Sequence, residues 1–88
     1  MNEKYQVIFT EPAERAYRKL DRSVQRRILA KAEQLGANPF PAGAIKLTGY
    51  DAHRLRIGDY RLIYTVQQGK LLVLVLDVGH RREVYRDL

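Results

Sequence analysis

The sequence HRLRIGDYRLIY, residues 53–64, predicts a tight β-hairpin, and this hairpin decides how the rest of the chain is arranged. Glycine at the first of the two central positions, Gly58 before Asp59, is what a type II′ two-residue turn requires. The turn fixes the strand register, which pairs Ile57 with Tyr60, Arg56 with Arg61, Leu55 with Leu62, Arg54 with Ile63 and His53 with Tyr64. Side-chain alternation then places the three arginines on one face of the hairpin. The apolar face carries Leu55, Ile57, Tyr60, Leu62, Tyr64 and Val66.

Before the hairpin, the sequence predicts one strand followed by two helices. Residues 4–10, KYQVIFT, alternate as a short strand does. Residues 10–20 follow with Pro12 in the first turn, where its missing N–H is tolerated, and with apolar residues at helical spacing. A second amphipathic helix runs over residues 21–36, and Gly36 is expected to end it. The two helices together form a helical hairpin.

The other connections are also marked in the sequence. Residues 36–51 hold three glycines and two prolines, which is typical of a loop, with a short extended piece at residues 45–47. A turn at 67–69 leads into residues 70–79, KLLVLVLDVG. Because nearly every position there is apolar, we expect a central strand covered on both faces, one of them by the helices. The polar remainder, residues 80–88, predicts a short C-terminal helical turn or a loose tail.

The order β-α-α-β-β-β predicts an α+β fold in a single domain spanning residues 1–88. Three antiparallel strands form a meander, and the N-terminal strand is added alongside them. The helical hairpin packs on the apolar face of this sheet. The arginine-bearing face is therefore the opposite one.

Composition narrows the classes of function. The chain has no cysteine, which removes disulfides, thiolate nucleophiles and cysteine-ligated zinc and favours a cytoplasmic location. No signal peptide or membrane span is expected, since the longest apolar run is far too short to cross a bilayer. The net charge is +6, and after position 53 the basic residues are six arginines and one lysine. Arginine suits phosphate recognition, so a polyanionic partner is favoured over charge that serves solubility alone.

The three arginines of the hairpin pose a question of their own, because like charges directly opposed across two strands destabilise a sheet. One interpretation is a solvated face, with the arginine stems lying over it and water screening the charged ends. The sharper interpretation is a phosphate-binding surface that the end of the chain can approach. His80 and Arg81 follow the last strand, and Tyr85 lies four residues after Arg81, on the same side in either helical or extended geometry. His53, in contrast, falls on the core side of the hairpin and is expected to be a packed histidine.

Clustered arginines with a tyrosine, and no acidic cluster for a metal, suit cleavage of RNA by its own 2′-hydroxyl. Guanidinium groups would hold the scissile phosphate and stabilise the added charge of the transition state. A tyrosine would stack on a base or exchange a proton with the leaving oxygen. Arginine is a poor proton acceptor, so the general base would be His80, Tyr85 or water. No metal or other cofactor is expected.

Four segments, YQVIFTEPAERAYRKLD, NPFPAGAIKLTG, HRLRIGDYRLIYTV and VGHRREVYRDL, together resemble the RelE/ParE superfamily of toxin–antitoxin toxins, and more closely its RelE branch. The resemblance implies a compact β-α-α-β-β-β fold, metal-independent and ribosome-dependent cleavage of mRNA, and neutralisation by a RelB-like antitoxin. It also implies that operator DNA is bound only by the toxin–antitoxin complex.

By position in the family, the resemblance assigns the site to Arg54, Arg56, Arg61, Arg81 and Tyr85. Arg54 and Arg56 stand where the best-known members have lysines, so the proton-abstracting role given to a lysine needs another group, and His80 becomes a candidate. Two alternatives stay open. One is a ParE-like inhibitor of DNA gyrase, and the other is a non-catalytic module that only binds an antitoxin or represses DNA with it.

Overall fold

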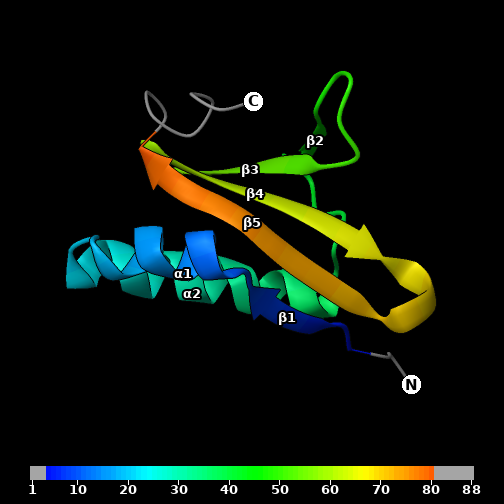
Figure 1. Ribbon diagram of the computed structural model, residues 1–88, viewed down its shortest axis with the longest axis horizontal. Helices are drawn as coiled ribbons and strands as arrows, with labels where there is room; N and C mark the ends of the chain where they lie inside the picture. Colours follow the sequence, from blue (N-terminus) through cyan, green and yellow to red (C-terminus); the bar gives the residue numbers. More distant parts are fainter. Residues whose placement is uncertain (1–3, 81–88) are drawn as a thin grey trace.

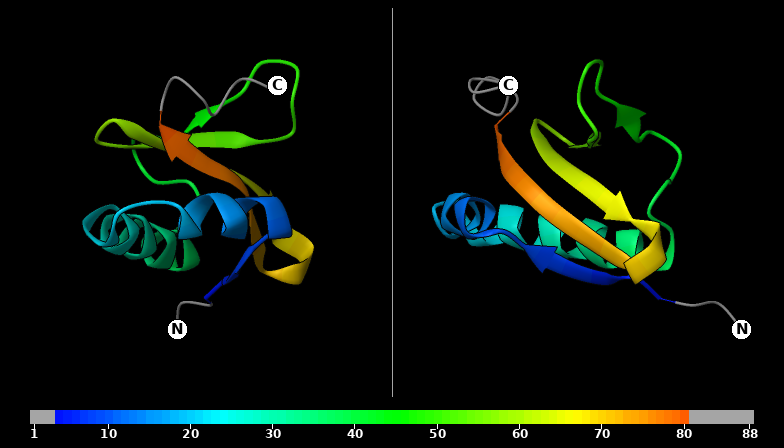
Figure 2. Two further views of the ribbon diagram at one scale, coloured as in Figure 1. Left: turned by 60° about the vertical axis from the view of Figure 1, so that its left-hand side comes forward. Right: turned by 45° about the vertical axis from the view of Figure 1, so that its right-hand side comes forward.

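The helices form one layer and the sheet another in the computed structural model, which describes residues 4–80 (Figures 1 and 2). The elements are β1 (Gln6–Phe9), α1 (Glu11–Arg18), α2 (Arg22–Ala37), β2 (Ile45–Lys46), β3 (His53–Ile57), β4 (Tyr60–Gln67) and β5 (Leu72–His80), and a 3₁₀ turn (Gln68–Lys70) joins β4 to β5. The sheet order is β1-β5-β4-β3-β2. The expected α+β fold is confirmed, while the predicted C-terminal helical turn lies outside the described residues. No helix in residues 4–80 is long and apolar enough to cross a membrane.

The hairpin has the register that its turn predicts. Residues 53–57 pair with residues 60–64 in the expected order, Arg56 lying opposite Arg61. Gly58 has a φ of +60°, and Asp59 does not share a positive φ, as a type II′ turn demands. The meander β3-β4-β5 is confirmed, β1 joins β5 in parallel, and the short extended piece at residue 45 is the two-residue strand β2 on the far side of β3.

The main core lies between the helices and one sheet face. Both helices lie on the same side of the sheet (Figure 1). Their buried residues meet alternate residues of the three meander strands. This cluster contains Ala13, Val24, Ile28, Leu35, Leu55, Ile57, Leu62, Tyr64, Val73, Val75 and Val78. Burial of these side chains supplies the main driving force for folding.

Residues at two helix ends bind the helices to neighbouring strands. Thr10 stands at the N-terminus of α1, but its Oγ1 donates to the carbonyl oxygen of Val75 at 2.9 Å, which ties the helix to β5. Gly36 does not end α2, which continues to Ala37. It is buried where the helix touches the start of β1, and the N–H of Tyr5 donates to its carbonyl oxygen at 2.8 Å. A Cβ at Gly36 would lie 3.1 Å from the carbonyl oxygen of Tyr5, so close approach explains the glycine.

The last strand is central, as expected, because β5 lies between β1 and β4. Its coverage differs from the expectation. The second face of β5 is incompletely covered, because Leu72, Leu74 and Leu76 are only half-buried while both described helices lie on the other side. An irregularity in the β4–β5 pairing follows Ile63, which pairs with Asp77, whereas Tyr64 pairs with Val75. Leu76 is thus the extra residue of a β-bulge.

Candidate functional site

The sheet face turned away from the helices carries the predicted arginines, and we call Arg54, Arg56 and Arg61 the arginine face. They alternate with core residues of β3 and β4, so their side chains leave the sheet on the uncovered side. Arg54 and Arg61 are half-buried, and Arg56 is exposed. The structure therefore brings together these three of the six predicted site residues.

An apolar patch forms part of the same surface. Ala52 and Ile63 are buried there, and Leu47 and Leu76 pack against them. Ile63 is the cross-strand neighbour of Arg54. Low-polarity surroundings reduce the screening of nearby charges, so an anion bound at this face would be held more strongly than on a fully solvated surface.

The bulge at Leu76 decides which residues of β5 join the arginine face. Val78 points into the core, so Asp77 and Gly79 lie on the uncovered side, opposite Ile63 and Arg61 respectively. Asp77 brings a half-buried carboxylate, whose Oδ1 accepts a hydrogen bond from the N–H of Val78 at 2.8 Å. Sequence reasoning missed Asp77 as a site residue, because an almost uniformly apolar strand gives no sign of where its alternation shifts.

The same bulge places His80 on the helix side of the sheet. His80 pairs with Tyr60, and the two rings meet edge to face with centroids 5.6 Å apart. Tyr60 itself packs against the main core. The structure thus does not bring the His80 ring onto the arginine face. The two remaining predicted residues, Arg81 and Tyr85, lie outside the described residues.

His53 is a packed residue, as its place in the hairpin predicts. Its ring stacks on Tyr64 with centroids 5.5 Å apart and meets Phe40 edge to face at 5.4 Å. The Tyr64 hydroxyl donates to the carbonyl oxygen of Pro39 at 2.7 Å. Burial raises the pKa of Tyr64 to about 12, since the phenolate would lose its hydration. This aromatic cluster holds the loop after α2 against the sheet.

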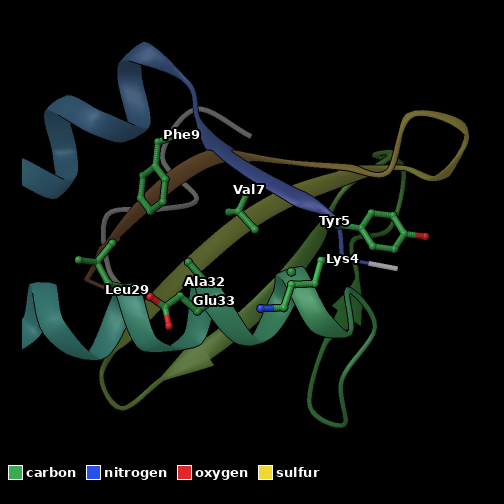
Figure 3. Close-up of a pocket in the computed structure, with 8 residues that line it drawn as sticks. Lys4, Tyr5, Val7, Phe9, Leu29, Ala32 and Glu33 are labelled. Carbon is green, nitrogen blue, oxygen red and sulfur yellow. The ribbon is translucent and has the colours of Figure 1, made fainter. Parts of the chain in front are cut away.

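A second surface feature was not expected from the sequence. A groove of about 560 Å³ runs between β1 and α2, lined by Lys4, Tyr5, Val7, Phe9, Leu29, Ala32, Glu33 and Gly36 (Figure 3). A smaller hollow of about 250 Å³ continues it past Phe9 and Leu29 to α1. Leu29, which lines both hollows, is an exposed large apolar residue. Strand β1 is the last in the described sheet, so its outer edge is free of strand pairing. The sequence signal near the groove is the apolar Leu29 on a polar face of α2, which by itself does not indicate a hollow.

Comparison with known proteins gives consistent similarities. Residues 7–85 match the family model described as the ParE toxin of the type II toxin–antitoxin system parDE. A RelE-like toxin protein of Escherichia coli is 36% identical over 81 residues, covering 89% of this chain and 84% of that protein.

Solved structures are similar throughout the chain as well. The toxin in the intact E. coli RelBE toxin–antitoxin complex is 34% identical, with a TM-score of 0.74 over 86% of this chain and 95% of that one. The toxin–antitoxin complex RelBE2 of Mycobacterium tuberculosis contains a chain that is 26% identical, with a TM-score of 0.78 over 91% of this chain and 94% of that one.

Proposed function

The chain belongs to the RelE/ParE superfamily of type II toxin–antitoxin toxins, and we propose that it is a ribosome-dependent endoribonuclease that cuts mRNA and so inhibits translation in the cytoplasm. The observation that carries the proposal is the arginine face, where the hairpin register sets Arg56 directly opposite Arg61 beside Arg54. Three guanidinium groups on one sheet face suit the recognition of a phosphate backbone.

In the proposed reaction, the 2′-hydroxyl of the substrate attacks the adjacent phosphorus atom and the bond to the 5′ oxygen breaks. Arg54, Arg56, Arg61 and Arg81 bind the phosphate and stabilise the extra negative charge of the pentacovalent transition state. Tyr85 stacks on a base or protonates the leaving oxygen. The ribosome supplies much of the substrate geometry, because precise alignment of the 2′-oxygen lowers the barrier by itself.

The proton of the attacking hydroxyl needs an acceptor other than arginine. Asp77 joins Tyr85 and water as a candidate, because its carboxylate lies on the arginine face. His80 was one of the candidates from the sequence, but it would have to reach this face from the side of Tyr60. The pH dependence of single-turnover cleavage distinguishes them. If Asp77 is the base, Asp77→Asn removes the acidic limb of the profile, whereas His80→Gln leaves that limb in place.

The proposal is tested in a translation extract by mapping mRNA ends after adding the purified toxin. Wild type should cut messages on translating ribosomes, and Arg61→Ala should reduce the rate by about 10²–10³-fold, as loss of one transition-state donor does. Arg18→Ala is the matched control, since Arg18 is an exposed arginine already paired with Glu14 on α1. The nuclease proposal fails if wild type cuts no message in the extract.

Gyrase inhibition is the second candidate, favoured by the description of the matching family model as a ParE toxin. Such an inhibitor would act by binding and would need no catalytic cluster. A supercoiling assay with the same protein preparation separates the two candidates, since inhibition that persists in Arg61→Ala would select this alternative. Inactivity in both assays, with antitoxin binding retained, would select the non-catalytic module.

We further propose that a RelB-like antitoxin neutralises the toxin and that operator DNA is bound only by their complex. Two of the similar solved structures are complexes of this kind. The groove between β1 and α2 offers an apolar surface beside a free strand edge, which suits an added peptide segment. Hydrogen exchange tests this placement, because the amides of residues 6–9 should exchange more slowly in the complex than in the free toxin. Unchanged exchange at these residues would mean that the antitoxin binds at another surface.

A further inference from the structure

A third hollow, about 410 Å³ in volume, lies where α2 meets the turn between β3 and β4, and we call it the helix–turn pocket. It is lined by Arg27, Ala30, Lys31, Arg56, Ile57 and Gly58. Three of these residues are cations and none is acidic. In residues 4–80, Arg27, Lys31 and Arg56 form no salt bridge. The pocket therefore brings together three cations that form no ion pair in the described part of the chain.

The charged residues of the two helices are arranged differently. On α1, Glu11 pairs with Arg15 and Glu14 pairs with Arg18, so acids stand in the first turn and bases in the last, as the helix dipole favours. On α2, the first turn has no acid, and Arg27 and Lys31 stand four residues apart on one face. Like charges at that spacing are unfavourable. Interactions within α2 therefore do not account for this placement of Arg27 and Lys31.

Close packing holds one of these cations at the hairpin turn. A Cβ built at Gly58 would lie 3.0 Å from Nη2 of Arg27. The absence of a side chain at Gly58 thus lets the guanidinium of Arg27 rest against the turn that also determines the hairpin register. Arg56 lines the same pocket and lies opposite Arg61 in the sheet. One residue therefore belongs to both the helix–turn pocket and the arginine face.

We propose that the helix–turn pocket is a second phosphate subsite, in which Arg27 and Lys31, with Arg56 at the boundary, bind a backbone phosphate of an RNA strand whose scissile phosphate lies on the arginine face. The inference deepens the proposed nuclease function and rests on it for the identity of the polyanion. Continuity through Arg56 favours an RNA strand over an acidic peptide, because one phosphodiester backbone can contact both surfaces. Phosphate contacts of this type position a strand without selecting its sequence.

The test measures binding of a single-stranded RNA with methylated 2′-hydroxyls, which cannot be cut, at a series of salt concentrations. Arg27→Gln/Lys31→Gln should flatten the plot of log affinity against log salt by about 0.7, because one phosphate contact of a single strand is lost. That change corresponds to about 5-fold weaker binding at 0.1 M salt relative to the 1 M limit. Arg15→Gln/Arg18→Gln is the control, since it removes the same charge from residues already paired on α1. Thermal melts of both variants establish that each is folded.

Each outcome either supports or overturns the phosphate subsite. Equal losses in the two double variants would show that only net charge acts, and an unchanged slope in Arg27→Gln/Lys31→Gln would show that the pocket does not bind RNA. A parallel titration with inorganic phosphate follows the amide resonance of Gly58. A phosphate-induced shift combined with wild-type RNA affinity in the double variant would assign the pocket to free phosphate and overturn the proposal. Because the RNA cannot be cut, the result stands apart from whether the protein is a nuclease.

Discussion

Gly58 combines two constraints at one residue, and their relative weight can be tested. Its φ of +60° disfavours any side chain, and a Cβ there would also crowd the guanidinium of Arg27. The guanidinium is the end of a flexible side chain and can move, so the backbone conformation should dominate. We expect Gly58→Ala to lower the free energy of unfolding by about 1–2 kcal/mol in urea titrations. Gly69→Ala is the control, because nothing lies within 4 Å of its added Cβ and its φ is not positive. Equal effects at the two glycines would contradict this account.

Tyr64 should make stability fall at high pH. Its folded-state pKa of about 12 exceeds the value of about 10 expected in the unfolded chain. The contribution of Tyr64 to the free energy of unfolding is fully present below pH 10. It is lost between pH 10 and 12, because the unfolded state then releases a proton that the folded state retains. Below pH 10, Tyr64→Phe should cost about 1–2 kcal/mol, since it leaves the Pro39 carbonyl without its donor.

Comparing wild type with Tyr64→Phe at different pH values tests whether stability falls as the pH rises. Between pH 10 and 12, wild type should lose about 1.4 kcal/mol per pH unit relative to Tyr64→Phe, measured by chemical denaturation. The other tyrosines are common to both proteins and cancel in the difference. A constant difference across that range would mean that Tyr64 is not protected by burial.

At the level of elements, α2 presents a core side chain and a surface side chain at adjacent positions. Ile28 is fully buried, whereas Leu29 is 45% exposed in the groove. Ile28→Ala should lower the free energy of unfolding by about 2–5 kcal/mol, because it removes buried contacts and leaves a cavity. Leu29→Ala should change it by less than about 0.5 kcal/mol, as surface substitutions usually do. A large loss from Leu29→Ala would indicate that the groove side of the helix contributes to the core.

The strands show why some elements are predictable from sequence and others are not. In β3 and β4, polar and apolar residues alternate and Gly58 allows one turn type, so both register and faces follow from the sequence. In β5, the apolar run from Leu72 to Leu76 has no alternation, so the sequence gives no sign of the bulge that sends Asp77 to the arginine face and His80 to Tyr60. The shared face of the three arginines was therefore predicted correctly, while the sides of the sheet on which Asp77 and His80 lie could not be.

At the level of the whole molecule, the sheet separates two surfaces. The arginine face lies on the side without helices, and the groove lies on the helix side, along the edge strand β1. The groove could not be predicted because it depends on how far α2 stands from β1, which arises from packing between segments distant in sequence. A segment of the antitoxin bound only in the groove would leave the arginine face open, so full neutralisation requires either a second segment or a change in the toxin.

This separation predicts that binding of the antitoxin and cleavage of mRNA can be lost independently. Leu29→Glu should weaken the antitoxin complex by about 30–100-fold, equivalent to about 2–3 kcal/mol, because it sets a charge in an apolar contact beside Glu33. It should leave cleavage by the free toxin unchanged, and Leu29→Met, which keeps the apolar volume, should behave as wild type in both assays. Arg61→Ala should show the reverse pattern, with cleavage lost and the complex retained. Calorimetry of the complex and cleavage in a translation extract measure the two properties, and parallel losses in either variant would mean that one surface serves both.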